Sequence, residues 1–159
     1  MKVLCVLNLL SRGGLSRERW PQILELFRAF KIEHEVLSSD APIDVLVRQR
    51  LERGGVGEFQ AIAGIGGDGT QSAVINGMMA YRKDHPDSVL PPLAFIPTGT
   101  GNDIAKSFGL TLRDDFFVND LRRSVSTLVH GADYHLDLGL LNGRYFADAL
   151  TVGVDSRTL

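Results

Sequence analysis

Two short glycine-rich segments hold the residues of this chain that are best suited to chemistry. Residues 66–70 read Gly-Gly-Asp-Gly-Thr, and residues 97–103 read Pro-Thr-Gly-Thr-Gly-Asn-Asp. Glycine lets the backbone turn with positive φ and approach a ligand closely. The N–H groups of such a turn, together with the N-terminus of a following helix, form a site for anions. Both segments are therefore candidate phosphate-binding loops.

The aspartate of the first segment needs an explanation, because its charge would repel phosphate. Asp68 makes chemical sense if it holds Mg²⁺, binds a nucleotide hydroxyl or orients a water molecule. The simpler interpretation is a turn, in which Asp68 is a turn residue and Thr70 caps the next helix. In either case we expect Asp68 to support no helix or core packing. The first segment alone leaves both interpretations open.

The second segment favours the ligand interpretation. Asn102 is a good helix N-cap and Asp103 a good first-turn residue, so a structural role explains these two positions. That role does not explain two Thr-Gly pairs in a row, at residues 98–101. Two loops of phosphate-binding type in one chain predict a shared nucleotide site.

Several other kinds of site are excluded or disfavoured. No glycine loop ends in Gly-Lys-Ser/Thr, which excludes a P-loop NTPase, and no Gly-x-Gly-x-x-Gly opens the first helix, which disfavours a dinucleotide oxidoreductase. The four histidines lack metal-ligand spacing. The 17 basic and 19 acidic residues give a formal net charge of −2, so composition offers no general attraction to nucleic acid. The single cysteine, Cys5, cannot form an intrachain disulfide and is expected in the core.

Strand-like and helix-like segments alternate around the two loops. We expect strands at residues 2–8, 33–37, 60–65 and 93–97. We expect a first helix that begins between Arg17 and Pro21. Further helices are expected at residues 43–53, 70–82, 102–108 and 115–129. This alternation predicts an α/β fold, a mostly parallel Rossmann-like sheet with helices on both faces. Both glycine loops follow a strand and precede a helix, so they should lie side by side at the carboxyl edge of the sheet.

The pattern changes after Gly131. Residues 134–141 and 144–152 look like two strands, and Asn142-Gly143 between them is a strong two-residue hairpin signal. We therefore expect a nucleotide-binding α/β domain at residues 1–130 and the truncated start of a β-rich domain at residues 131–159. Two strands are too few for a stable sheet, so they should pack on the α/β domain or form a homodimer with a second chain.

Together the two motifs resemble the diacylglycerol kinase catalytic domain, a family that includes bacterial lipid kinases, sphingosine kinases and ceramide kinases. NAD kinases share the first motif, whereas the second motif favours the lipid kinases. Residues 137–139, 142–146 and 153–155 also resemble the start of the second domain of that family. The resemblance thus covers the whole chain.

The resemblance implies a cytoplasmic kinase that acts peripherally at the membrane surface and transfers the γ-phosphoryl of ATP to a lipid hydroxyl. ATP and Mg²⁺ would be its cofactors, lipid and nucleotide its partners, and nucleic acid would not be a partner. Asp68 would be catalytic and would meet the metal indirectly, through nucleotide-bound Mg²⁺. The implied ATP-binding residues are Asn8, Ser38, Ser39, Gly66, Gly67, Asp68, Gly69, Thr70, Gln71, Ser72, Thr98, Gly99, Thr100, Gly101, Asn102 and Asp103.

The chain departs from the family pattern in three ways. Leu9 stands where proline usually follows Asn8, and Ser38 or Ser39 stands where a threonine meets ATP. Family members are also about twice this length or more, and the additional part would supply the catalytic base and much of the lipid pocket. Three alternatives stay open: an NAD kinase-like enzyme, a non-catalytic nucleotide-binding module, and a structural domain without a ligand. The sequence does not identify the lipid acceptor.

Overall fold

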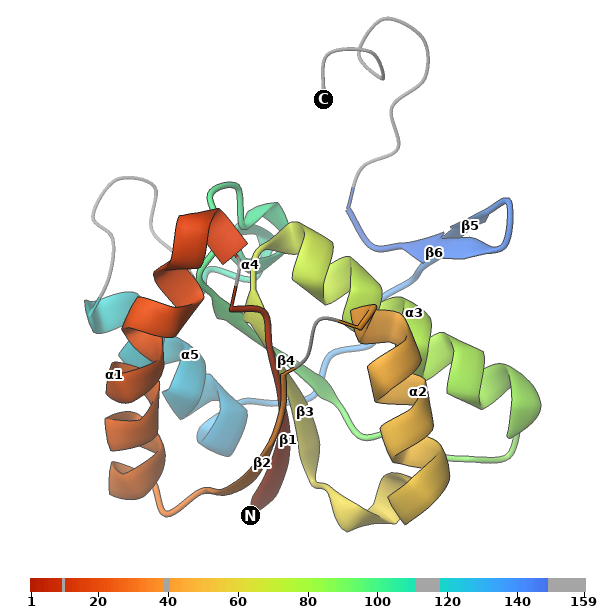
Figure 1. Ribbon diagram of the computed structural model, residues 1–159, viewed down its shortest axis with the longest axis horizontal. Helices are drawn as coiled ribbons and strands as arrows, with labels where there is room; N and C mark the ends of the chain where they lie inside the picture. The colour runs from red at the N-terminus through yellow and green to blue at the C-terminus, as the bar shows by residue number, and fades with distance from the viewer. Residues whose placement is uncertain (10, 39–40, 111–117, 149–159) are drawn as a thin grey trace, which may run out of the picture.

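The computed structural model of the chain describes residues 1–9, 11–38, 41–110 and 118–148. A four-stranded sheet with the strand order β2-β1-β3-β4 lies at its centre (Figure 1). The strands are β1 (Lys2–Leu7), β2 (Glu33–Leu37), β3 (Ala61–Gly66) and β4 (Leu93–Pro97). Each pairing is parallel, so the carboxyl ends of all these strands lie at one edge. The predicted fold class is confirmed.

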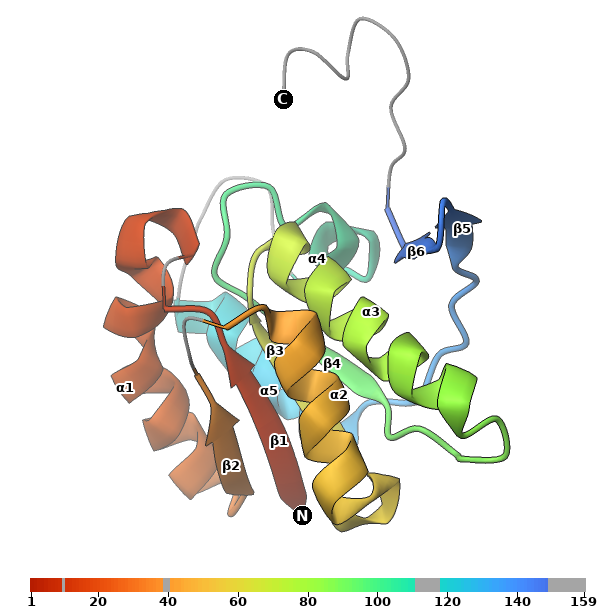
Figure 2. The same ribbon diagram turned by 45° about the vertical axis from the view of Figure 1, so that its right-hand side comes forward.

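Helices cover both faces of the sheet, as Figures 1 and 2 show. Helices α1 (Leu15–Ala29) and α5 (Val118–His130) lie on one face, and α2 (Ile43–Gly54) and α3 (Asp68–Asp84) lie on the other. A short helix, α4 (Asp103–Ser107), follows β4. The 3-10 turns η1 (Ser11–Gly14) and η2 (Val56–Glu58) precede α1 and β3. Within the described residues, no helix combines the length and the apolar character that a membrane crossing needs.

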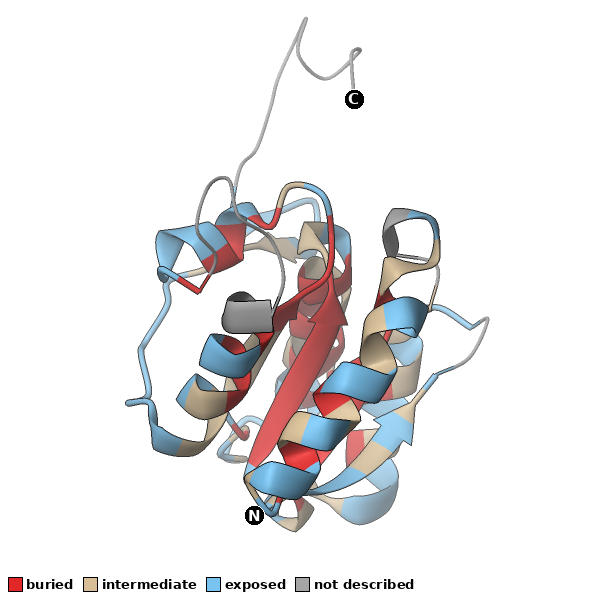
Figure 3. Cartoon of the chain, turned by 90° about the vertical axis from the view of Figure 1, so that its left-hand side faces the viewer, coloured by how far each residue is buried: buried red, intermediate tan, exposed pale blue. Residues whose placement is uncertain are grey.

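The core forms one layer on each face of the sheet. The inner strands β1 and β3 are buried along nearly their whole length, as parallel strands covered on both faces must be. Phe27 of α1 and Val125 of α5 belong to one layer, and Val47 of α2 and Val74 of α3 belong to the other. Figure 3 shows the buried residues on the strands and on the inward helix faces. Cys5 lies in this core as expected, and burial raises its pKa to about 12.

Two helices begin earlier than the sequence pattern predicts. Helix α1 starts at Leu15, so Pro21 lies inside the helix and not at its start. Helix α3 starts at Asp68 with Gly67 as its N-cap, so Thr70 is not the cap. In both helices the first turn makes hydrogen bonds to segments at the sheet edge. Because these contacts are tertiary, local helix propensity does not reveal them.

The β segment is formed only in part as predicted. Strands β5 (Gly139–Leu141) and β6 (Arg144–Phe146) pair in antiparallel fashion. Between them, Asn142 and Gly143 have φ values of 48° and 79°, as a two-residue type I′ turn requires. Residues 134–138 and 147–148 form no strand, which corrects both strand predictions. Three of their side chains instead line an apolar cavity of about 580 Å³ along the outer edge of β4, namely Tyr134, Leu136 and Leu138.

Some expectations fall on residues outside the described ranges. These are Ser39, the start of the helix predicted at residues 115–129, and the part of the second predicted strand beyond residue 148. The domain boundary after residue 130 stays a prediction.

Candidate nucleotide-binding site

The two glycine loops, residues 66–70 and 97–103, meet at the carboxyl ends of β3 and β4. The N–H of Thr98 donates to the carbonyl oxygen of Gly66 at 2.9 Å. A Cβ at Gly67 would stand 3.0 Å from the Cα of Gly99, so glycine at these positions permits the two backbones to approach. The prediction that the loops lie side by side is confirmed.

Asn102 holds the second loop in a closed turn. Its Oδ1 accepts the N–H of Gly99 at 2.9 Å, and its Nδ2 donates to the carbonyl oxygen of Gly99 at 2.8 Å. The φ of Asn102 is 54°, a left-handed conformation that asparagine adopts more readily than most residues. The buried amide therefore shapes the loop, and it makes no side-chain cap bond to α4.

Thr98 ties the second loop to the start of α1. Its Oγ1 lies 2.6 Å from the Oγ of Ser16, and both side chains are buried. Ser16 was not predicted as a site residue, and its only signal in the sequence is its position two residues after the Gly13-Gly14 pair. The hydroxyl of Thr98 thus faces α1 and fixes the loop from behind.

Asn8 makes the matching link for the first loop. Its Nδ2 donates to the Oγ1 of Thr70 at 3.0 Å, and its backbone N–H donates to the carbonyl oxygen of Ile65 at 3.1 Å. Thr70 is buried in the first turn of α3. The end of β1 and the start of α3 are therefore held together across the sheet edge.

Asp68 connects the two loops. Its Oδ1 accepts the N–H of Ile104, in the first turn of α4, at 3.2 Å, and a Cβ at Gly101 would stand 2.8 Å from its Oδ2. Asp68 itself is the first residue of α3, where a negative charge interacts favourably with the helix dipole. The expectation that Asp68 supports no helix is wrong, because it satisfies a backbone donor of α4.

The first turn of α3 also offers backbone donors to a ligand. The N–H groups of Thr70 and Gln71 donate to the carbonyl oxygen of Gly67. Those of Asp68 and Gly69 have no acceptor among the described residues. Gly69 is exposed, and a Cβ there would meet nothing within 4 Å. Free donors and open space at the N-terminus of a long helix suit a phosphate group.

Three carboxylates from separate segments face this edge: Asp68 of α3, Asp103 of α4, and Asp148, which follows β6. Asp103 pairs with the Nζ of Lys106 at 2.8 Å. Partial desolvation, and then the charges of Asp68 and Asp103, raise the pKa of Asp148. Asp148 was not predicted as a site residue, because no sequence motif marks it.

These carboxylates suit a metal ion that arrives with a ligand better than a resident one. Within the ranges that the structure describes, no group of three His, Cys, Asp or Glu side chains could hold a metal ion. Mg²⁺ binds readily through substrate phosphates, water and one or two carboxylates. The residues present therefore fit nucleotide-bound Mg²⁺ with Asp68 as a neighbour.

The remaining predicted site residues differ in how far they are exposed and in which groups they contact. Ser38 is exposed just after β2, beside the end of β1. Ser72 and Gly101 are half-buried, and Thr100 is exposed. The side chain of Gln71 is buried, and its Nε2 donates to the carbonyl oxygen of Gly64 at 2.9 Å. That side chain therefore lies between α3 and β3 and away from the loop surface, unlike the position that the family resemblance implies.

Two other features lie apart from the loops. No residue of either glycine loop lines the cavity along β4, where Phe108 contacts both Phe95 and Tyr134 at ring-centroid distances of 5.8 and 5.9 Å. Three of the four histidines contact aromatic rings, as ordinary packing residues do: His34, His85 and His130. These features do not contribute to the surface that the two glycine loops form.

Known proteins resemble this chain in sequence. Residues 2–139 match the family described as the diacylglycerol kinase catalytic domain. A diacylglycerol kinase of Bacillus subtilis (strain 168) is 35% identical over 89 residues, which are 56% of this chain and 25% of that protein. A diacylglycerol kinase of Staphylococcus carnosus (strain TM300) is 29% identical over 96 residues, which are 60% of this chain and 27% of that protein. The matched part is thus about a quarter of each relative.

A solved structure extends the likeness to the fold. The crystal structure of a diacylglycerol kinase from Bacillus anthracis str. Sterne superposes with a TM-score of 0.65 at 20% identity. The superposition covers 91% of this chain and 45% of that one. On the family match over residues 2–139, the chain belongs to the diacylglycerol kinase catalytic domain family.

Proposed function

We propose that this chain supplies the ATP-binding half of a lipid kinase, which transfers the γ-phosphoryl of ATP to a lipid hydroxyl. The observation that carries the proposal is the close approach of Gly67 and Gly99, which joins the two glycine loops into one surface. That surface lies at the N-terminus of α3, where two backbone donors have no acceptor in the part of the chain that the structure describes. Membership of the diacylglycerol kinase catalytic domain family supports kinase chemistry and a lipid acceptor.

The residues of the proposed site fall into two groups. Backbone groups of residues 66–69 and 99–103 would bind the phosphates, with Ser38 and the hydroxyl of Thr100 at the rim. The side chains of Asn8, Thr70, Thr98 and Asn102 bond to protein groups and hold the loops in place. Backbone donors held in place by these side chains need no rearrangement when charge develops on the phosphoryl group.

Asp68 has a double role in this proposal. One carboxylate oxygen holds α4 through the N–H of Ile104, and the other is directed toward Gly101, between the loops. Bound with the nucleotide, Mg²⁺ would neutralise phosphate charge during transfer. Asp68 would provide a fixed negative charge beside that cation. We assign no general base to residues 1–159, and we place the enzyme peripherally at the cytoplasmic face of a membrane.

Calorimetry with ATP and Mg²⁺ on the purified chain, beside transfer of radiolabelled phosphate, tests the proposal. We expect the chain to bind ATP weakly and to phosphorylate diacylglycerol too slowly to be useful, because we assign it no general base. The native protein should phosphorylate the lipid. Absence of nucleotide binding would refute the proposed site. Transfer to NAD in place of lipid would identify an NAD kinase-like enzyme, and binding without transfer by the native protein would identify a non-catalytic module.

A further inference from the structure

The β5–β6 hairpin is attached to α3 through the side chain of Asn76. The Oδ1 of Asn76 accepts the N–H of Tyr145 at 2.9 Å, and its Nδ2 donates to the carbonyl oxygen of Tyr145 at 2.9 Å. A neighbouring antiparallel strand would make the same two bonds with a residue of β6. The amide of Asn76 therefore takes the place of a strand at this edge of the hairpin.

The register of the hairpin explains why Tyr145 is the residue that is bound. Leu141 and Arg144 flank the two-residue turn, and Leu140 is paired with Tyr145. In antiparallel pairs, hydrogen-bonded and non-hydrogen-bonded positions alternate, so the N–H and carbonyl groups of Tyr145 point away from β5. Leu140 is the equivalent position on the opposite edge, where no acceptor for its N–H lies among the described residues.

Asn76 is well suited to hold a fixed position. Its side chain is 9% exposed, and its Nδ2 also donates to the carbonyl oxygen of Ser72 at 2.8 Å, within the same helix. The next residue, Gly77, packs against α2 so closely that a Cβ would stand 2.6 Å from the carbonyl oxygen of Asp44. Helix α3 is thus fixed on its far side by α2 and presents a rigid platform to the hairpin.

The same helix links the hairpin to the first glycine loop. Asp68 begins α3, and Asn76 follows about two turns later, on the order of 12 Å along the helix axis. Figures 1 and 2 show the hairpin beside this helix. Two residues beyond β6, Asp148 lies within electrostatic range of Asp68 and Asp103. Attachment at Tyr145 therefore carries the end of the hairpin toward the loops.

We propose that Asn76 is a positioning residue that fixes the β5–β6 hairpin, and the acceptor-side segment that the hairpin begins, relative to the nucleotide-binding loops. The attachment of the hairpin stands on the geometry alone. Its importance for phosphoryl transfer rests on the proposed function. Asn76 contacts neither glycine loop, so its loss should displace the acceptor side and leave ATP binding intact.

Amide hydrogen exchange measured by NMR on the 159-residue chain tests the attachment. In the parent chain the N–H of Tyr145 should exchange at least about tenfold more slowly than that of Leu140, because one is bound and the other is not. Equal exchange at the two positions would overturn the proposal without any substitution being made.

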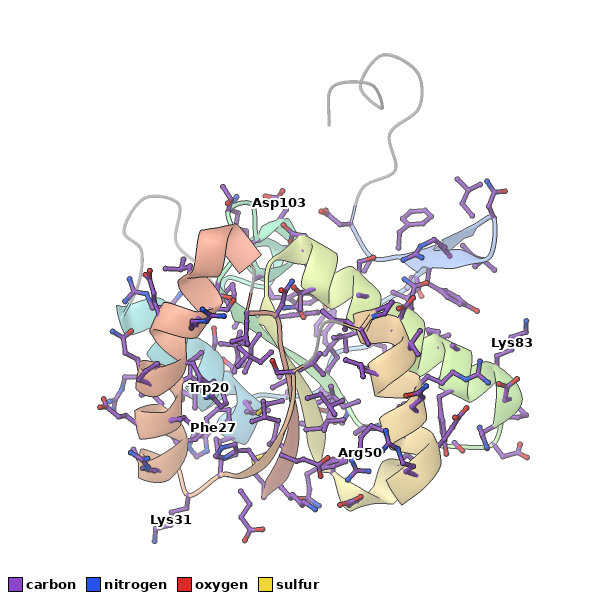
Figure 4. The ribbon with its side chains drawn as sticks, viewed as in Figure 1. Trp20, Phe27, Lys31, Arg50, Lys83 and Asp103 are labelled. Carbon is purple, nitrogen blue, oxygen red and sulfur yellow. The ribbon has the colours of Figure 1, made fainter. Side chains whose placement is uncertain are left out.

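Substitutions then test Asn76 itself. Asn76→Leu removes both bonds at similar size, and Asn76→Ala removes them while favouring the helix. Each variant should accelerate exchange at Tyr145 about tenfold, while the amides of β1 keep their protection. The control is Lys83→Ala, a substitution of an exposed residue on the same helix, and its exchange should match that of the parent chain. Figure 4 labels Lys83 far from the loops. Unchanged exchange at Tyr145 in a folded variant, or equal acceleration in β1, would refute the role of Asn76.

A kinetic measurement on the native enzyme tests the functional part. Asn76→Ala should lower kcat by about tenfold or more and change the KM for ATP by less than about twofold, since misplacement of a reacting group costs rate and not nucleotide affinity. An unchanged kcat would refute the positioning role. A fall in kcat accompanied by a clear rise in the KM for ATP would refute it too. A parent enzyme without lipid kinase activity would refute the proposed function, whereas the exchange experiment decides the attachment independently.

Discussion

The amino and carboxyl edges of the sheet are built in opposite ways. At the amino edge, Arg50 pairs with Glu35 at 2.5 and 2.8 Å and with Glu58 at 2.6 Å, and its guanidinium lies 4.6 Å from the ring centroid of Phe59. Lys2 also pairs with Glu58 at 2.5 Å. Each of these charges has a partner of opposite sign. The amino edge therefore has the character of a structural ion-pair network.

The carboxyl edge brings like charges and free donors together. The charges of Asp68 and Asp103 act on Asp148, and the N–H groups of Asp68 and Gly69 have no acceptor among the described residues. Figure 4 shows Asp103 and Arg50 at opposite ends of the molecule. Like charges that act on one another, next to unbonded backbone donors, are typical of ligand sites. We therefore expect the carboxyl edge to bind a ligand and the ion pairs of the amino edge to stabilise the fold.

The largest effect is expected from Asp68→Asn in a native enzyme that carries this chain. The amide oxygen can still accept the N–H of Ile104, so the fold should persist, while loss of the charge disturbs the site. Turnover should fall by about a hundredfold or more, the scale of a misplaced reacting group. Kinetics paired with thermal melting measure this, and near-normal turnover would return Asp68 to a purely structural role.

Gly99→Ala should have the next largest effect, on ATP affinity. The new Cβ would overlap the backbone of Gly67 and force the loops apart, and we expect calorimetry to show affinity reduced by about ten- to a hundredfold. Gly57→Ala is the matched control, because a Cβ there meets nothing within 4 Å and its φ is not positive. Equal affinities in the two variants would contradict a site between the loops.

Arg50→Leu should affect stability alone. It removes the ion pairs to Glu35 and Glu58 and the contact with Phe59, at an edge far from the loops. Since partly exposed pairs contribute little, the Tm should fall by roughly 2–4 °C. Thermal melting and calorimetry on one preparation separate the two properties. A change in ATP affinity would show that the two edges are coupled.

The smallest effect should appear in the response to pH. Hydrogen bonding from Arg50 lowers the pKa of Glu35 below its ordinary value of 4.5, so its contribution to stability is present above that value and is lost as pH falls through the lowered pKa. The pKa of Asp148 is raised above 3.8, so docking of the hairpin is most stable below 3.8 and weakens as pH rises through the raised pKa. Acid should therefore weaken the α/β core and strengthen hairpin docking.

Thermal melting measures the stability of the core, and exchange protection at Tyr145 measures docking of the hairpin. Both are followed as the pH is lowered through the ordinary pKa values of Glu35 and Asp148. Asp148→Asn is the control, because it should abolish the pH dependence of docking and leave that of the core. If the stability of the core and the docking of the hairpin changed in the same direction with pH, the contrast between the two edges would be contradicted.

Much of the fold and of the loop site was predictable from local patterns. The apolar runs of β1 and β3, the strand-to-helix position of both glycine loops and the Asn142-Gly143 turn are short-range signals, and the structure confirms them. The strand predicted at residues 134–138 failed for a physical reason. Tyr134, Leu136 and Leu138 alternate as strand residues do, but they only line the cavity along β4, and no described strand pairs with them.

The sequence by itself determined that the chain has a parallel α/β sheet with two glycine loops on one edge, because strand burial and glycine turns depend on neighbouring residues. Only the tertiary structure decided which side chains support those loops. Ser16 meets Thr98, Asp68 meets Ile104, and Asn76 meets Tyr145 across gaps in sequence that no local pattern spans. Hydrogen bonds of this kind depend on where packed helices bring their side chains, and that placement arises only when the two core layers close over the sheet.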